Sequence, residues 1–438
     1  MKARNLTLGL ALFASGLATG RAEAAVFNVT DVPGLLAAMT TAQSNGEADT
    51  INLAAGTYTL TAVDNSDVFG NPNGLPTPSG GLSLIGAGAG STIIERDSGA
   101  PDFRFLVIPS GSSVLLKDLT LTGGRLTAPA GVSAGAIINQ GQLTIDDCVI
   151  ANSHADFAGG IQTMDGGGDP ADLTIRNSTV SGNSASSVGG ALRALFRHNT
   201  RIIDSTISGN SATDVAGIES NGALGSPSLL TISGSTISGN TATGSAAAIG
   251  LGPVQVSIYR SSITGNTTPG FGVIRSFGAR ISLEESLVSG NSAAGDAIIF
   301  LVGGAIFVGG DFGSELRAVN STISGNTGVS AITTYPGDGQ NIATLTNTTI
   351  TNNATPLNGL GAIAAASGNT VTLRNTILAN NTNGDNVAPN CSGTIGSLGN
   401  NVIGTVSTCN FKDKPTDVTN ANPNLGPLAA NGGPTMTH

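Results

Sequence analysis

The sequence contains no tryptophan and only three tyrosines, and charged residues make up just 11% of it. Sugar binding by ring stacking would therefore depend on Tyr58, Tyr259 or Tyr335, which disfavours a lectin of that kind. The 18 lysines and arginines are outnumbered by 28 acidic residues. The net charge of −10 disfavours nucleic acid and, for the chain as a whole, any polyanion, because such partners need clusters of basic side chains.

Several kinds of site are also missing. The three histidines, His154, His198 and His438, lie too far apart in the repeat described below to form a transition-metal site. No Gly-x-Ser-x-Gly elbow or phosphate-binding loop is present, which disfavours serine hydrolase and nucleotide chemistry. Beyond the amino terminus, no stretch approaches the ~18 apolar residues of a membrane helix.

The amino terminus has the pattern of a secretory signal peptide. Lys2 and Arg4 precede an apolar run from Leu6 to Ala18, and a small-x-small site ends at Ala24. We expect residues 1–24 to be removed by cleavage after Ala24. The mature chain is then secreted or associated with the cell surface or outer membrane of a bacterium, without a transmembrane helix.

What the sequence has in abundance is a repeat. The block ending in Ser-Gly-Asn at Asn183 recurs with Asn at the same place, at intervals that average about 28 residues. The later copies end at Asn210, Asn240, Asn266, Asn291 and Asn326, and degenerate copies end at Asn353 and Asn381. Apolar and small residues alternate within each block, as in half-buried strands. A unit of this size cannot bury its apolar face alone, so we expect about ten stacked coils of an all-β, right-handed parallel β-helix.

The repeat also assigns roles to particular residues. Stacking places the asparagines in register, and we interpret them as a structural ladder of amides rather than as a binding site. The segment Asp31–Gln43, with Pro33 in its first turn, predicts a short helix that covers the amino-terminal end. Cys391 and Cys409 are expected to form a disulfide in a loop-rich tail, whereas Cys148 is expected to be a buried apolar side chain.

The opening segment Phe27–Leu60, the motif Leu82-Ser-Leu-Ile-Gly-Ala-Gly and the repeats resemble pectin-lyase-like β-helix proteins of bacteria with polymorphic-outer-membrane-type repeats. The segments 397–404 and 425–438 are similar to a choice-of-anchor Q-like carboxy-terminal region. The resemblance implies that this region continues beyond His438, so we expect a truncated chain. We divide it into the signal peptide, residues 25–80 with the cap helix and first coil, repeats over 81–385, and the tail 386–438.

The pectin-lyase-like proteins that the chain resembles include pectin-degrading enzymes, so the chain was searched for acid, base and metal-binding groups. Of the polygalacturonase motifs only a paired aspartate, Asp146-Asp147, is present. The repeat register places Asp146 between Lys117 and Arg176 on neighbouring coils, which favours an ion ladder over an acid and base pair. Asp165, Asp169 and Asp172 in a Gly-rich loop are weak Ca²⁺ candidates, and otherwise no cofactor is expected.

The densest basic cluster comprises Arg193, Arg197, His198 and Arg201. The cluster could bind an anionic sugar. The weak catalytic candidates are Arg193 and Arg197, together with Asp146 and Asp147. An alternative is structural, because a column across the coils is expected to bring Arg193 next to Glu219. The column is expected to contain Asn139, Gln162, Arg193, Glu219 and Arg275.

Two functions remain open. The leading hypothesis is an exported, non-catalytic surface β-helix for adhesion or for binding carbohydrate or protein. The alternative is a polysaccharide lyase or hydrolase acting on an acidic polysaccharide. Fold alone does not choose between them, because this architecture hosts unrelated functions.

Overall fold

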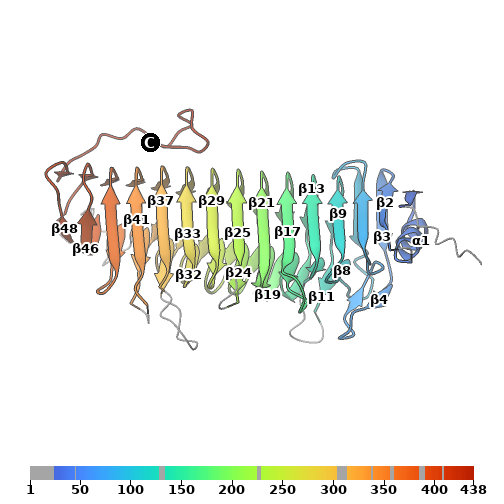
Figure 1. Cartoon of the computed structure of the whole chain (residues 1–438). Coiled ribbons are helices and arrows are strands. Elements are labelled where there is room, and N and C mark those ends of the chain that lie inside the picture. The colour runs from blue at the N-terminus through green and yellow to red at the C-terminus, as the bar shows by residue number, and fades with distance from the viewer. Residues whose placement is uncertain are drawn as a thin grey trace, which may run out of the picture.

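The computed structural model of the chain is a right-handed parallel β-solenoid of about 12 turns (Figure 1). It describes residues 24–44, 46–127, 134–223, 228–302, 313–336, 339–355, 360–383, 390–406 and 409–438. The expected signal peptide lies outside these residues except for Ala24. The predicted fold class is confirmed, and the coils are somewhat more numerous than the ten that the clearest repeats indicated.

The turns in the middle of the rod add parallel strands to three sheets, and the first and last turns add strands to two of them. The 25-stranded sheet contains a column of long strands, which lie side by side on one face of the rod in Figure 1. These are β1 (Val26–Val29), β2 (Ala48–Leu53), β6 (Gly81–Ile85), β9 (Ser113–Lys117), β13 (Gln142–Asp146), β17 (Ala171–Arg176), β21 (His198–Ile203), β25 (Leu229–Ser233), β29 (Gln255–Tyr259), β33 (Arg280–Glu284), β37 (Glu315–Val319), β41 (Ile342–Thr346), β44 (Thr370–Arg374), β46 (Cys391–Ser397) and β48 (Cys409–Lys412).

The same sheet contains a second column, which precedes the long strand in each turn. It consists of β8 (Leu106–Ile108), β12 (Ile137–Asn139), β16 (Ile161–Met164), β20 (Leu192–Phe196), β24 (Ile218–Gly222), β28 (Ile249–Leu251), β32 (Ile274–Phe277), β36 (Ile299–Val302), β40 (Ile332–Thr334) and β43 (Ile363–Ala365). A hairpin of β4 (Asn65–Ser66) and β5 (Pro72–Asn73) is the one antiparallel pair among the named strands of the described chain.

After the long strands from β2 onward the chain turns into a 14-stranded sheet, and in the turns from β11 to β39 it then enters an eight-stranded one. The 14 strands are β3 (Gly56–Leu60), β7 (Thr92–Arg96), β10 (Thr120–Thr122), β14 (Val149–Ala151), β18 (Thr179–Ser181), β22 (Thr206–Ser208), β26 (Thr236–Ser238), β30 (Ser262–Thr264), β34 (Leu287–Ser289), β38 (Thr322–Ser324), β42 (Thr349–Thr351), β45 (Ile377–Ala379), β47 (Val402–Ile403) and β49 (Val418–Thr419). The eight are β11 (Arg125–Leu126), β15 (His154–Phe157), β19 (Ser184–Val188), β23 (Ser211–Ala212), β27 (Thr241–Ala242), β31 (Thr267–Thr268), β35 (Ser292–Ala293) and β39 (Thr327–Gly328).

The interior of the rod is filled by stacked aliphatic side chains. Ile175, Ile202, Ile232 and Ile258 occupy equivalent positions on four consecutive long strands, and each is fully buried. The side chains between them in sequence point outward, which is the alternation seen in the repeat. The apolar periodicity of the sequence therefore becomes one continuous core.

Two corners per turn need backbone in the left-handed region. The first corner, between a long strand and the 14-stranded sheet, is taken by residues such as Asn177, whose φ is 50°. The second is taken by the glycine of the Ser-Gly-Asn block, and Gly182 has a φ of 64°. Asparagine and glycine are the residues that adopt this conformation at least cost, which explains their recurrence.

The asparagines that follow the second corner form the predicted ladder. In the middle of it, Asn266 donates from Nδ2 to Oδ1 of Asn291 at 3.0 Å and accepts from Nδ2 of Asn240 at 2.9 Å. The backbone N–H of Asn240 donates to the same Oδ1 of Asn266 at 3.0 Å. These side chains are buried, so the ladder satisfies their polar atoms from turn to turn and confirms its structural interpretation.

A second ladder follows the first corner, where hydroxyl groups take the same role. The backbone N–H of Ser178 donates to Oγ of Ser205 at 3.1 Å, and the pattern continues through Ser235. Cys148 occupies this column one turn earlier, and its N–H donates to Oγ of Ser178 at 3.0 Å. Its thiol is 2% exposed, and burial raises the pKa of that thiol to about 12.

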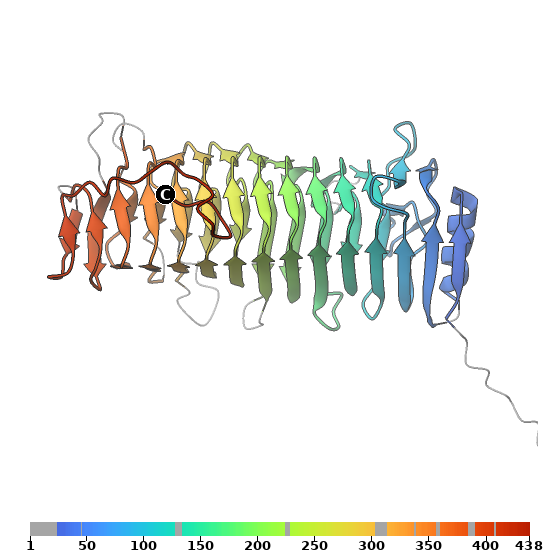
Figure 2. The same ribbon diagram turned by 90° about the horizontal axis from the view of Figure 1, so that it is seen from above.

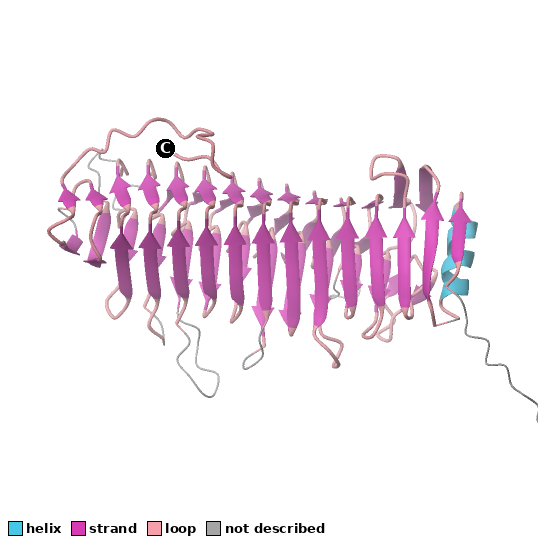
Figure 3. Cartoon of the chain, turned by 45° about the horizontal axis from the view of Figure 1, so that its top comes forward, coloured by secondary structure: helices cyan, strands magenta, loops and turns pink. Residues whose placement is uncertain are grey.

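The helix α1 (Val32–Ala42) lies at the amino-terminal end of the rod, as Figure 3 shows. Asp31 is its N-cap and accepts a hydrogen bond from the N–H of Gly34 at 2.8 Å, while Pro33 lies in the first turn. Leu35 and Met39 are buried against the first strands. The prediction of a cap helix over Asp31–Gln43 is thereby confirmed. No helix in the described ranges is long and apolar enough to cross a membrane.

The carboxy-terminal segment turns back over the rod, as Figure 2 shows from above. The imidazole Nε2 of His438 lies 2.6 Å from Oγ of Ser324, and the Thr435 hydroxyl donates to the carbonyl of Glu285 at 3.2 Å. Outward residues of β34 and β38 are buried, whereas those of β22, β26 and β30 are partly exposed. The segment therefore covers two turns of the 14-stranded sheet.

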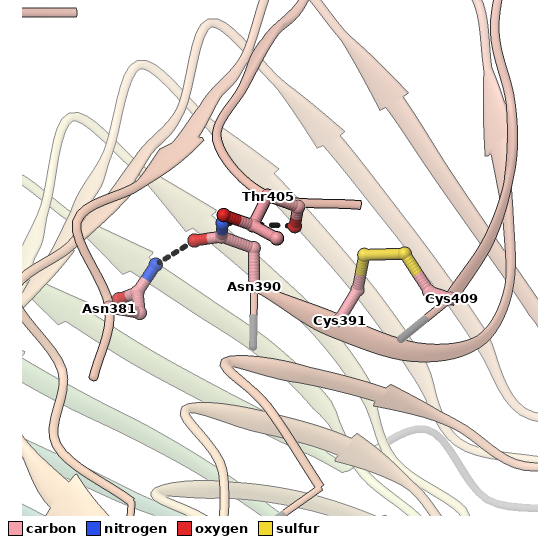
Figure 4. Close-up of a disulfide and its surroundings, with 5 residues drawn as sticks. All are labelled: Asn381, Asn390, Cys391, Thr405 and Cys409. Atoms are coloured by element: carbon pink, nitrogen blue, oxygen red, sulfur yellow. Dashed lines mark hydrogen bonds between the residues drawn. A yellow bond between two sulfur atoms is a disulfide. The ribbon is translucent and has the colours of Figure 1, made fainter. Parts of the chain in front are cut away.

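The expected disulfide joins Cys391 of β46 to Cys409 of β48 (Figure 4). Beside it, the asparagine ladder ends where Asn381 donates to Asn390 at 3.1 Å, and Asn390 donates to the carbonyl of Thr405 at 3.1 Å. The bridge thus ties together the two last long strands, next to the end of the ladder.

The environments of the three cysteines predict how many thiols react in the native, the unfolded and the reduced protein. With Ellman's reagent, we expect no reactive thiol in the native protein, because Cys148 is buried. Unfolding in guanidinium without reductant should expose one thiol, and unfolding with prior reduction should expose all three cysteines. Detection of three thiols without reductant would contradict the Cys391–Cys409 bridge, and one in the native state would contradict the burial of Cys148.

Candidate functional site

Asp146, the first candidate acid, lies at the end of β13 between two cations. Its Oδ2 is 3.1 Å from Nζ of Lys117 on β9 and 2.9 Å from Nη2 of Arg176 on β17. The hydrogen bond from Arg176 is the main reason why the pKa of Asp146 is lowered. A carboxylate held ionised in this way is poorly suited to donate a proton, so the arrangement is the ion ladder that the register predicted.

The other catalytic candidates do not join Asp146. Asp147 lies at the first corner with a φ of 52°, and its carboxylate is 3.3 Å from Nζ of Lys117. Arg193 belongs to β20, in the other strand column and two turns further along the rod. No contact in the described part of the chain joins the aspartate pair to Arg193 or Arg197, so these four residues form no common cleft there.

Arg193 and Arg197 have carboxylate partners of their own. Nε of Arg193 is 2.6 Å from Oε2 of Glu219 on β24, and its guanidinium lies 4.6 Å from the ring centre of Phe157. Nε of Arg197 is 2.7 Å from Oδ2 of Asp165, and its Nη2 also donates to the carbonyl of Gly168. The predicted Arg193–Glu219 pair is confirmed, and both guanidinium groups are already occupied.

The predicted column containing Arg193 was wrong at one position. The observed register is Ile138, Gln162, Arg193, Glu219, Gly250 and Arg275. Asn139 pairs instead with Thr163 and points inward, where its amide donates to the Thr163 hydroxyl at 3.0 Å. A slip of one residue transfers a side chain to the opposite face of a strand, which explains the error.

His198 is buried rather than available to a ligand. Its side chain is enclosed between β20, β21 and β24, with Nδ1 at 3.2 Å from the Thr200 hydroxyl and Nε2 at 3.3 Å from the Ser220 hydroxyl. Burial lowers the pKa of His198 to about 4, so the imidazole is neutral at physiological pH.

Arg201 is different, because its guanidinium points outward from the middle of β21 and is partly exposed. Among the described residues it has no ion-pair or hydrogen-bond partner. Its neighbours along the rod are hydroxyl residues, Thr174 on β17 and Thr231 on β25. Of the four residues in the predicted basic cluster, Arg201 alone thus presents an unpaired charge at the surface within the described ranges.

The three carboxylates considered for Ca²⁺ are separated. Asp165 faces Arg197, Asp169 is exposed in the loop, and Asp172 points outward from β17. Across the described ranges, no group of three or more histidine, cysteine, aspartate or glutamate side chains is positioned to hold a metal ion.

Next to Arg201 the outer face of the long strands forms a shallow groove of about 380 Å³ over β25, β29, β33 and β37. Its outward lining consists of Leu229, Thr231, Gln255, Ser257, Arg280, Ser282, Glu315 and Arg317. Two ion pairs join the neighbouring strands β33 and β37 at the groove. Arg317 pairs with Glu284, and Nε of Arg280 lies 3.9 Å from Oε2 of Glu315. Counted with Arg201 and its diagonal neighbour Asp172 on β17, the groove region carries three arginines and three carboxylates.

Sequence reasoning did not find this groove. Its residues come from four blocks about 25 to 35 positions apart, and none belongs to a recognisable motif. The signal that could have found it was the column Thr231, Ser257, Ser282 and Arg317, which continues from Arg201 in the same register.

No protein-family model and no curated protein sequence matches the chain. Solved structures of similar shape include the A-module of mannuronan C-5 epimerase AlgE4 from Azotobacter vinelandii, with 18% identity, a TM-score of 0.45, and coverage of 75% of this chain and 94% of that one. Another is the catalytic unit of a GH87 α-1,3-glucanase from Streptomyces thermodiastaticus, with 13% identity, a TM-score of 0.40, and coverage of 88% and 66%. Values this low carry no argument about activity or site residues.

Proposed function

We propose that this β-solenoid binds an extended acidic polysaccharide along the face of its long strands, with Arg201 and the neighbouring groove as the binding site. The observation that supports this is a surface guanidinium without an acidic partner in the described chain, at the edge of a groove lined by hydroxyl, amide and guanidinium groups. Such groups donate hydrogen bonds to sugar hydroxyls and carboxylates.

The geometry of the face suits a linear polymer. Equivalent positions on successive strands recur at ~4.8 Å along the rod, so an extended ligand would meet one outward polar side chain of this column on every turn. The groove spans four consecutive long strands, and Arg201 extends the row by one more. Although the whole chain has a net charge of −10, the guanidinium of Arg201 makes no ion pair in the described chain, which favours an acidic group of the ligand at this point of the row.

Cleavage of the bound polysaccharide is a second candidate, and one observation favours it. The carboxylate of Asp172 on β17 points outward and, like Arg201, has no partner in the described ranges. Asp172 lies opposite Asn199, two positions from Arg201 on the neighbouring strand, so the two side chains are diagonal neighbours at roughly 7–8 Å. A polymer bound across both would contact a potential acid or base and a cation.

We expect Arg201→Gln to weaken binding of polygalacturonate about tenfold, because the glutamine removes the unpaired charge but keeps an outward polar side chain. Isothermal titration calorimetry at fixed, low salt measures the effect. Lys412→Gln is the charge-matched control, since Lys412 is exposed at the end of β48, four long strands beyond the last strand of the groove. Its affinity should stay within twofold of the parent.

Product analysis of the same mixtures separates binding from cleavage. Unchanged polymer length after prolonged incubation supports a binding protein. Cleavage that Asp172→Asn abolishes while binding persists would replace the first proposal by the second. Equal affinity of the parent and Arg201→Gln would reject the site itself. Adhesion at a cell surface is a proposal that depends on such a ligand, and export is a proposal that rests on the signal-peptide pattern of residues 1–24.

A further inference from the structure

A second hollow lies elsewhere on the rod, at the second corner of the turns that contain β7, β10 and β14. It has a volume of about 480 Å³, and it is lined by Arg96, Ser98, Ala100, Asp102, Gly123, Gly124, Arg125, Asn152 and His154. None of these residues lines the groove on the long strands. We refer to this hollow as the corner pocket.

Two arginines share a single carboxylate in the corner pocket. Nη2 of Arg96 is 3.2 Å from Oδ1 of Asp102, and Nε of Arg125 is 3.2 Å from the same oxygen. The hydroxyl of Thr127 also donates to Asp102. Asp102 is thus already engaged, and the lining retains one positive charge beyond it.

The two arginines differ in the exposure of their side chains and in the number of guanidinium nitrogens that already have a partner. The side chain of Arg96 is 7% exposed, and its Nε donates to the carbonyl of Pro101 at 2.9 Å. The side chain of Arg125 is 53% exposed and contacts Asp102 through Nε alone, so its two terminal nitrogens have no partner in the described chain. Two parallel N–H donors on a guanidinium match the spacing of two oxygen atoms of an oxyanion.

Further donors line the same hollow. Nδ1 of His154 is 2.8 Å from Oγ of Ser184, which leaves Nε2 as the ring nitrogen for a ligand. The Asn152 amide makes only a long contact of 3.4 Å with Thr122, and the Ser98 hydroxyl has no hydrogen bond in the described chain. The pocket therefore presents several neutral donors around one free guanidinium.

We propose that the corner pocket binds one small oxyanionic group, a carboxylate, a sulfate or a phosphate ester, with the terminal nitrogens of Arg125 as its main donors. Arg96 holds Asp102 in place and thereby positions Arg125. This site is independent of the polysaccharide groove, and neither proposal requires the other.

The test is a titration of the full chain with sodium acetate, sodium sulfate and sodium phosphate, at an ionic strength held constant with sodium chloride. Binding is followed by the NMR signals of the imidazole C–H groups, because one of the three histidines lines the pocket. We expect saturable binding of at least one anion in the millimolar range. The planar acetate and the two tetrahedral anions distinguish the classes of ligand.

Arg125→Gln should weaken that binding at least tenfold, and Arg125→Lys, which keeps the charge but not the two parallel donors, should give an intermediate loss. Arg374→Gln, at an exposed arginine remote from the pocket, should bind as the parent does. Circular dichroism confirms that each variant is folded. Absence of saturable binding for all three anions, or unchanged binding by Arg125→Gln, overturns the proposal, and neither result bears on the Arg201 site.

Discussion

Replacing Asn266 by alanine is expected to lower the free energy of unfolding by about 3 to 5 kcal/mol, because the substitution leaves several buried polar groups without partners. The N–H and Nδ2 of Asn240 both donate to Oδ1 of Asn266. The carbonyl of Ile237 loses its bond from Nδ2 of Asn266, at 2.9 Å. A buried donor or acceptor without a partner costs about 1 to 3 kcal/mol.

The measurement is guanidinium unfolding followed by far-ultraviolet circular dichroism. The matched control is Asn410→Ala, since Asn410 is exposed on β48 and its amide makes only a contact of 3.5 Å with Thr394. Its stability should change by less than about 0.5 kcal/mol, as for most surface substitutions. Similar losses for the two variants would show that the ladder contributes little beyond filling space.

Acidification between pH 6.5 and 4 is expected to destabilise the protein through His198 by up to about 3 kcal/mol. Burial lowers the pKa of His198 in the folded chain to about 4, whereas an unfolded histidine titrates near its ordinary value of 6.5. Above pH 6.5 the imidazole is neutral in both states, so the full stability is present. As the pH falls, the unfolded chain takes up a proton that the folded chain rejects, and below pH 4 both states are protonated.

The experiment compares unfolding free energies of the parent and His198→Gln at half-unit steps of pH. The difference between the two curves isolates His198, because all other titrating groups are common to both proteins. His154→Gln is the control, since His154 is half-buried and its pKa is also lowered, though by less. If the His198→Gln curve falls as steeply as that of the parent across this window, the histidine does not carry the acid sensitivity.

The sequence was sufficient to predict the fold, the asparagine ladder and the buried interior, because all three follow from the repeat. Asn240 and Asn266 could be placed in one column by counting alone, and the apolar alternation required a buried interior. The pairing of Arg193 with Glu219 followed from the same counting. The error at Asn139 arose where the connection between corner and strand changes length, from 13 residues between Gly124 and Ile137 to eight between Ser153 and Ile161 in the next turn, which periodicity does not specify.

The candidate sites were less accessible to that reasoning. The charge of Arg201 is significant because no carboxylate forms an ion pair with it in the described chain, whereas Arg193 and Arg197 each have an ion-pair partner. Asp165, the partner of Arg197, comes from a loop of irregular length, so the repeat could not assign it. The corner pocket likewise depends on the segment between β7 and β8 that carries Asp102, whose side chains the repeat does not specify.

The asparagine ladder also gives the rod an electrical direction. All seven side-chain links from Asn183 to Asn381 run the same way, with Nδ2 donating to the asparagine of the following turn. Amide dipoles aligned head to tail add together and polarise one another, so each bond in the middle of such a chain is stronger than one at its end. The interior turns should therefore hold together most tightly, and the solenoid should fray from its two ends.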